Sequence, residues 1–143
     1  MSRRKARETA LQMLFQLDVG QNDWPMVEIT LEEAGLTPAN KDFAACLVHG
    51  AREKMGQIDQ MIEARSREWD LDRLANVDKN ILRLAIWELT YGLDDLDVNI
   101  IINEAIELAK KFSTEDSGAF VNAILDNIVK EVKSNKEKGA ERT

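Results

Sequence analysis

The chain has 143 residues, of which 44% are hydrophobic and 31% are charged; this composition excludes extensive disorder and suits one domain or two small halves. The formal net charge of −7 argues against broad, unspecific binding to nucleic acid. A single cysteine excludes an internal disulfide, and no apolar run is long enough to span a membrane, so we expect a cytoplasmic protein.

Two helices are expected at the start of the chain. Apolar residues recur at helical spacing from Ser2, a suitable N-cap, until Gly20 interrupts the pattern. A second, shorter helix is predicted over residues 24–34, because Asp23 can cap it and Pro25 suits its first turn.

A long third helix is predicted to begin at Thr37 and Pro38 and to continue to about Ile62. Its apolar residues keep a spacing of three or four positions, which is typical of a helix with one buried face. Gly50 and Gly56 weaken this helix, although a glycine also allows another helix to approach closely.

The middle of the chain contains a hinge and a further helix. Residues 65–75 are charged and irregular, and we interpret them as the hinge between two halves. The next helix is expected from Asn76, which can serve as its cap, to about Gly92, and residues 93–97 then form a turn.

Two more helices complete the predicted set. The isoleucine-rich run at 98–102 favours a strand, but apolar residues continue at helical spacing to Phe112, and this length favours a helix. The last helix is predicted to begin at Asp116 or Ser117, either of which can cap it, and a polar, charged tail follows at residues 133–143.

The pattern as a whole predicts an all-α fold. No strand alternation and no hairpin turn signal is evident, so we expect six or seven helices in two packed helical bundles within a single domain. The N-terminal bundle is expected at about residues 2–64 and the C-terminal bundle at about residues 76–132.

The sequence lacks the residue patterns of common catalytic and metal sites. His49 is the only histidine, and there is no Glu-x-x-His pair, Cys/His cluster or phosphate-binding glycine loop. Cys46 lies among apolar neighbours and is expected to be a small core residue. We therefore expect no enzyme activity, no cofactor and no metal.

A concentrated basic patch opens this acidic chain. It consists of Arg3, Arg4, Lys5 and Arg7. At physiological salt a charge acts over about 8 Å, so a local patch can bind an anionic partner despite the overall negative charge. Arginine side chains contact phosphates through a planar fork of donors, so the patch is a candidate nucleic-acid surface.

Phe15 shares a face of the first helix with part of this patch. On a helical wheel of about 100° per residue it lies about 150° from the core stripe, with Arg4 and Leu11 on its side and Arg7 on the flank. Phe120 lies about 95° from the apolar stripe of the last helix. Because aromatic rings stack on unpaired bases, the two phenylalanines predict a composite stacking surface for a nucleic acid. Leu11 and Phe15 could instead face the second bundle or a dimer partner.

Three segments of the chain resemble the NusB family of bacterial transcription antitermination factors. They are RRKARETALQMLFQLD at the start, VDKNILRLAIWEL in the middle and INEAIELAKKFSTEDSGAFVNAILDNI near the end, and the similarity extends from Arg3 to Ile128. The resemblance implies two packed helical bundles and no catalysis. It also implies pairing with NusE, a small-subunit ribosomal protein, and binding of boxA RNA in ribosomal RNA transcripts, together with other Nus factors and RNA polymerase.

The resemblance further implies roles for individual residues. Those expected to contact RNA are Arg3, Arg4, Lys5, Arg7, Phe15 and Phe120. Lys5 departs from an all-arginine run and keeps the charge without the bidentate fork. Asp78 falls where the family often has an acid facing the NusE partner. Asp116 lies one turn before Phe120, and we expect its negative charge to weaken RNA binding.

Two alternative functions stay open at this point. The first is a homodimeric helical interaction protein that uses the face of Leu11 and Phe15 as its interface. The second is an RNA-binding module related to the NusB-like domains that are fused to ribosomal RNA methyltransferases. Because no cofactor-binding α/β pattern follows the last helix, we expect no fused enzyme.

Overall fold

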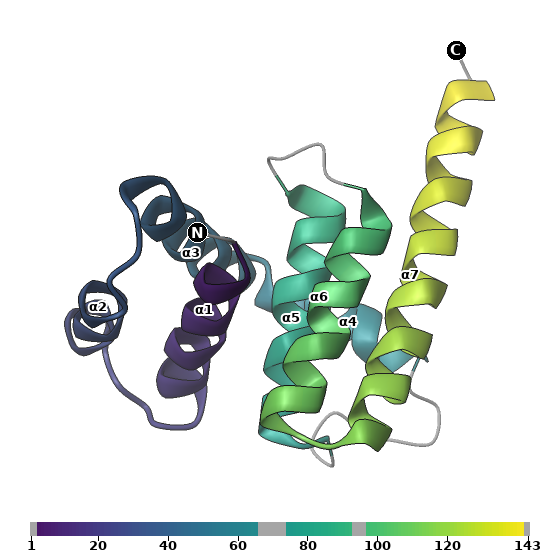
Figure 1. Cartoon of the computed structure of the whole chain (residues 1–143). Coiled ribbons are helices and arrows are strands. Elements are labelled where there is room, and N and C mark those ends of the chain that lie inside the picture. The colour runs from purple at the N-terminus through teal and green to yellow at the C-terminus, as the bar shows by residue number, and fades with distance from the viewer. Residues whose placement is uncertain (1–2, 66–73, 93–96, 142–143) are drawn as a thin grey trace.

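The computed structural model describes residues 3–65, 74–92 and 97–141, and their side chains as far as Val132 (Figure 1). Within those residues the chain forms seven helices and no strand, so the predicted all-α fold is confirmed. They are α1 (Arg3–Asp18), α2 (Trp24–Glu33), α3 (Pro38–Glu53), α4 (Met55–Arg65), α5 (Asn76–Tyr91), α6 (Val98–Phe112) and α7 (Glu115–Glu141). None of the described helices is long and apolar enough to cross a membrane. The expected cap Ser2, most of the hinge and most of the turn at 93–97 lie outside the described residues.

Two helices begin with a side-chain cap, at the predicted cap Asp23 and at Thr37, where the third helix was predicted to begin. The Asp23 side chain accepts a hydrogen bond of 3.3 Å from the backbone N–H of Met26 at the start of α2. The Thr37 hydroxyl accepts one of 3.3 Å from the backbone N–H of Asn40 at the start of α3. Each bond satisfies a donor that the first turn of a helix would otherwise leave without a partner.

Two other helix starts differ from the prediction. Asn76 is the first residue of α5; Ala75 occupies the cap position and makes no side-chain hydrogen bond. At the start of α7 the cap is Thr114, whose hydroxyl accepts a hydrogen bond of 3.1 Å from the backbone of Ser117, so neither Asp116 nor Ser117 is the cap. Several neighbouring polar residues can suit one helix start, and the sequence pattern alone does not choose between them.

The predicted long third helix is in fact two helices, α3 and α4, which are separated by Lys54. This residue has a φ of −102° and a ψ of 12°, outside the values of a regular α-helix. Its N–H still donates to the carbonyl of Gly50 at 3.1 Å, and its own carbonyl accepts from Ile58 at 2.9 Å. Because hydrogen bonds continue through the break, the apolar spacing continues as well, and the sequence does not reveal it.

Helix α5 is the centre of the molecule. It packs against α1 and α3 on one side and against α4, α6 and α7 on the other (Figure 1). Every residue from Asn80 to Glu88 is buried, as expected for a helix covered on all sides. Helix α4 packs more extensively against α5 than against α3, whereas the predicted grouping placed residues up to about 64 in the N-terminal bundle.

Helices α1, α2 and α3 form one group and α4 to α7 form the other, and the two groups meet closely where α3 faces α5. A Cβ atom at Gly50 would lie 2.1–2.4 Å from atoms of the Trp87 indole, so only a glycine lets the indole rest on the α3 backbone. The expected close approach at Gly50 is therefore confirmed. At Gly56 a Cβ atom would have no described neighbour within 4 Å, so this second glycine serves no such approach.

Candidate nucleic-acid interface

Two ion pairs link the first half of α1 to α6, and Arg4 makes the first of them. Its Nε and one Nη each donate a hydrogen bond of 3.0 Å to the Glu104 carboxylate. The Arg4 side chain stays 55% exposed, so this bidentate pair lies at the surface. The hydrogen bond from Arg4 holds the pKa of the Glu104 carboxyl below its usual value. An acidic side chain of the same molecule therefore occupies the guanidinium fork of Arg4.

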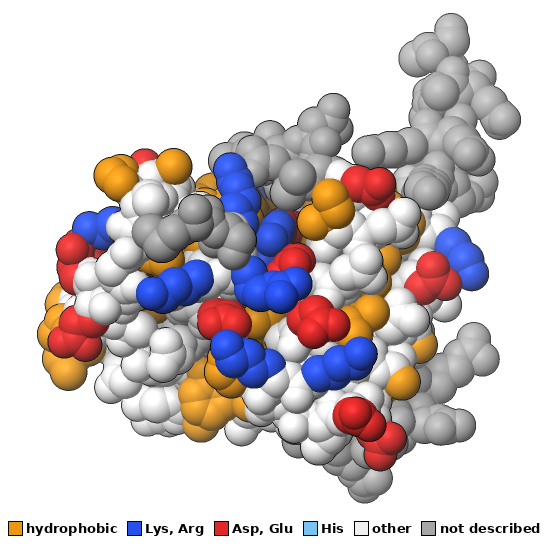
Figure 2. All heavy atoms as spheres, viewed as in Figure 1, with side chains coloured by type: hydrophobic (Ala, Val, Ile, Leu, Met, Phe, Trp, Pro, Cys, Tyr) orange, Lys and Arg blue, Asp and Glu red, His pale blue; other side chains and the backbone are white. Residues whose placement is uncertain are grey.

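A second ion pair joins the same two helices with the charges reversed. The Lys111 ammonium of α6 donates to Glu8 of α1 at 2.8 Å. The two pairs border a shallow hollow of about 140 Å³, which is also lined by Glu107 and Leu108. Figure 2 shows blue and red side chains next to one another across the middle of this face. The surface is therefore a mixed field of charge rather than a purely basic patch.

Arg7 lies inside the molecule, away from this surface. It is 6% exposed, and its Nε and one Nη each donate to the Glu88 carboxylate of α5 at 2.8 Å. Its guanidinium also lies 5.2 Å from the centroid of the Phe43 ring. The expected surface contact of Arg7 with RNA does not fit this position, because α5 supplies a buried acid that a wheel of one helix does not include.

Arg3 and Lys5 complete the basic segment at the surface. The Arg3 guanidinium lies 4.1 Å from the centroid of the Phe43 ring, which is a cation–π distance. Lys5 is exposed. Of the four predicted cations, Arg3, Arg4 and Lys5 are therefore at least partly exposed at the start of α1, whereas Arg7 is buried.

The two apolar residues on the outer side of α1 have different surroundings. Leu11 is 5% exposed and belongs to the hydrophobic core. Phe15, one turn further along the helix, is half-buried. Leu11 therefore contributes to packing, whereas part of the Phe15 ring remains available to a ligand.

Phe120 and Asp116 lie on α7, which packs along α6. Phe120 is half-buried and packs against the edge of the core. Asp116 is exposed in the first turn of the helix. In Figure 1, α5 and α6 lie between α1, which carries Phe15, and α7, which carries Phe120.

Asp78 is a buried residue of α5. It is 7% exposed, and its carboxylate accepts a hydrogen bond of 2.8 Å from the hydroxyl of Ser117. This bond fastens the start of α5 to the start of α7. The expected direct contact with a partner does not fit that burial, since the carboxylate faces α7 and not the solvent.

Sequence reasoning missed the acids Glu88 and Glu104 and the ring of Phe43. Glu88 and Glu104 both stand in the segments that carry the family resemblance, but their partners Arg7 and Arg4 lie 81 and 100 residues away in the chain. A local pattern cannot pair residues at such distances. One signal of such pairing was present in the sequence. The first helix carries several arginines and also has apolar residues opposite its core stripe, which suggests that a second element packs there.

Residues 4–130 of the chain match the family model described as the NusB family. The chain belongs to the NusB family. The transcription antitermination protein NusB of Syntrophomonas wolfei is 48% identical over 132 residues, which make up 92% of this chain and 98% of that relative. The resemblance seen in the three sequence segments is thereby confirmed.

Solved structures of NusB proteins share this fold. A T. maritima NusB has a TM-score of 0.81 and 38% identity, with 92% of each chain covered. A chain from a crystal structure of the antitermination factors NusB and NusE in complex with double-stranded RNA has a TM-score of 0.82 and 29% identity; the match covers 90% of this chain and 96% of that one. The NusB fold therefore extends over nearly all of the chain.

Proposed function

We propose that this chain is a non-catalytic, RNA-binding transcription antitermination factor. In this proposal it pairs with a NusE-type ribosomal protein and binds boxA-type single-stranded RNA in ribosomal RNA transcripts, in the cytoplasm. It acts there with other Nus factors and RNA polymerase. The name of its relatives and the NusB–NusE–RNA complex among its structural neighbours support this function.

The observation that carries the proposal is the cluster of Arg3, Arg4 and Lys5 at the accessible end of α1. These cations suit phosphates, while the net charge of −7 on the whole chain limits binding to arbitrary RNA. We assign phosphate contacts to the three cations and base stacking to Phe15 and Phe120, which are both half-buried residues.

Arg7 and Asp78 have supporting roles in this proposal. Arg7 is bound to Glu88, so it positions α1 for the RNA and does not touch it. Asp78 accepts the hydrogen bond of Ser117. It therefore fixes the starts of α5 and α7 relative to each other, and the ribosomal partner binds the surface that they form. The acidic body of the chain favours a basic partner, since opposite charge speeds the encounter and sets its orientation more than it adds affinity.

The first test removes the three surface cations in an Arg3/Arg4/Lys5→Ala variant. We expect its affinity for boxA-type single-stranded RNA to fall by about tenfold at 0.15 M salt. The slope of log K against log salt should decrease by about two, because each phosphate contact to a single strand contributes roughly 0.7. Filter binding or fluorescence anisotropy over a series of salt concentrations measures both quantities.

An Arg52/Lys130→Ala variant, which removes two exposed cations on other helices, is the control. It should bind RNA like the wild type, and both variants should bind the NusE-type protein normally. Unchanged RNA affinity in the Arg3/Arg4/Lys5 variant would contradict the proposal. A preference for double-stranded RNA of the same sequence would contradict the single-stranded assignment.

A second test neutralises Asp116. We expect Asp116→Asn to raise RNA affinity about two- to threefold, because it removes an exposed negative charge one turn before Phe120. The helix should keep its cap, since Thr114 supplies it. Glu115→Gln, a neutralisation in the same turn, is the matched control, and an equal gain in both variants would show a general effect of charge with no local role for Asp116.

A further inference from the structure

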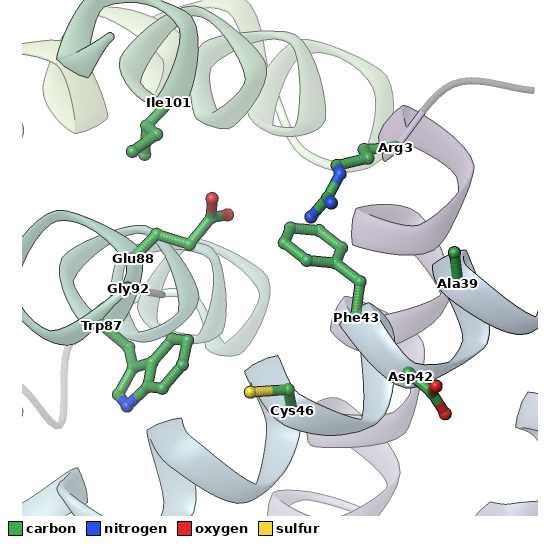
Figure 3. A pocket seen from close by; sticks show the side chains of 9 residues that line it. All are labelled: Arg3, Ala39, Asp42, Phe43, Cys46, Trp87, Glu88, Gly92 and Ile101. Atoms are coloured by element: carbon green, nitrogen blue, oxygen red, sulfur yellow. The ribbon is translucent and has the colours of Figure 1, made fainter. Parts of the chain in front are cut away.

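A second hollow, of about 260 Å³, lies between the two groups of helices beside the start of α1 (Figure 3). Its walls come from Arg3 of α1, Phe43 and Cys46 of α3, Trp87 and Glu88 of α5 and Ile101 of α6. Phe43 and Cys46 are only partly buried, so the hollow is open to solvent. None of the roles proposed above uses it.

The size of the hollow suits one aromatic ring system. It exceeds the roughly 150 Å³ of an engineered cavity that binds benzene in another protein. It is smaller than the pockets of about 300 Å³ and more that hold drug-sized ligands. A single nucleobase falls between these limits.

The walls combine apolar faces with one acceptor group. Trp87 is 8% exposed and Ile101 is 5% exposed, so both present buried apolar surface. In Figure 3 the Glu88 carboxylate points towards the middle of the hollow, while Asp42 points away from it. The two hydrogen bonds from Arg7 hold that carboxylate in place.

A carboxylate with this arrangement distinguishes between bases. Each oxygen of Glu88 accepts one hydrogen bond from Arg7 and retains a second lone-pair site. Carboxylates accept hydrogen bonds from the exocyclic amino group of cytosine. Uracil has no exocyclic amino group, and its one donor on this edge, the ring N3–H, is flanked by two carbonyl oxygens, which a carboxylate repels.

The hollow also adjoins the basic segment. Arg3 lies at its edge, over the ring of Phe43, and Arg4 and Lys5 follow directly in α1. We propose that the hollow receives one unstacked, amino-bearing nucleobase of the RNA strand that binds at the start of α1. This inference rests on the proposed function and adds a base-selective position to it.

Cys46 reports on the occupancy of the hollow. It is the only cysteine in the chain, and its thiol points into the hollow in Figure 3. We expect saturating boxA-type RNA to slow its alkylation by iodoacetamide about tenfold, because the reaction of a thiol depends on access to it. An oligouridylate at equal occupancy, measured by anisotropy, should give little protection. Mass spectrometry of the intact protein gives the rates.

A variant with a larger side chain in the hollow tests the same proposal without alkylation of the thiol. Cys46→Leu should weaken binding of boxA-type RNA by about fivefold, the lower end of what base stacking contributes, and leave oligouridylate affinity unchanged. Replacement of successive nucleotides by abasic residues should identify one position at which wild-type protection is lost. Thermal melting checks that the variant is folded. Glu88 is unsuitable for this test, since its replacement would leave Arg7 buried without a partner.

The outcomes separate the two proposals. If RNA binds at saturation and Cys46 reacts at the rate of the free protein, the base site is wrong and the RNA-binding function stands. If the oligouridylate protects Cys46 as well as boxA-type RNA does, the strand covers the opening without inserting an amino-bearing base, and the inference is wrong. If no single-stranded RNA binds, both proposals are wrong.

Discussion

Replacement of Arg7 by alanine is expected to lower the free energy of unfolding by about 3–5 kcal/mol. The side chains of Arg7 and Glu88 are each 7% exposed, and two hydrogen bonds of 2.8 Å join them. Without Arg7, the buried Glu88 carboxylate would lose these two charge-assisted hydrogen bonds. Urea denaturation followed by circular dichroism measures the loss.

Two further variants show whether the pair causes the effect. Arg7→Met with Glu88→Leu removes both charges and should recover most of the stability, because a buried ion pair is often replaceable by apolar residues of similar size. Arg4→Ala should leave stability nearly unchanged, since Arg4 is mostly exposed. Equal destabilisation by Arg4→Ala and Arg7→Ala would contradict the distinction between the two arginines.

The same double variant separates folding from RNA binding. If Arg7 only positions α1, the folded double variant should bind an oligouridylate with wild-type affinity. A folded double variant that binds this RNA more weakly would instead restore Arg7 as a direct RNA contact. The oligouridylate is the appropriate ligand here, because the double variant also changes a wall of the hollow between α3 and α5.

Gly50→Ala is expected to lower the free energy of unfolding by about 3 kcal/mol or more. A Cβ atom there would lie 2.1–2.4 Å from the indole of Trp87, and overpacking of a filled core typically costs about 1–3 kcal/mol. The indole is rigid and 8% exposed, so relief requires it to shift towards the neighbouring hollow or α3 and α5 to separate. Thermal and urea denaturation measure the change.

Gly56→Ala is the matched control, because Gly56 is also a helical glycine but has no described neighbour within 4 Å of an added Cβ atom. It should stabilise the protein by about 0.5–1 kcal/mol, the usual difference in helix propensity. A Gly50→Ala/Trp87→Leu double variant should recover part of the loss caused by Gly50→Ala alone. Similar stabilities for Gly50→Ala and Gly56→Ala would show that the contact with Trp87 does not constrain α3.

Much of the fold was predictable, because helical periodicity is a local property. The apolar spacing in α1, α6 and α7 identified the side of each helix that is buried, and residues such as Met13, Ile102 and Leu125 are indeed in the core. The cap Asp23 located the start of α2, and the Thr37-Pro38 pair located the start of α3. The break at Lys54 was not predictable, since it leaves the spacing and most hydrogen bonds intact.

The candidate site was predictable only as a set of residue types. The sequence by itself determined that an acidic, all-helical chain begins with four cations and carries Phe15 and Phe120 off its apolar stripes. Only the tertiary structure decided that Arg7 is a buried partner of Glu88, while Arg4 remains at the surface against Glu104. The physical reason is that burial and charge pairing depend on which helix packs opposite a residue. Here those partners come from α5 and α6, which are distant from α1 in the sequence but contact it in the fold.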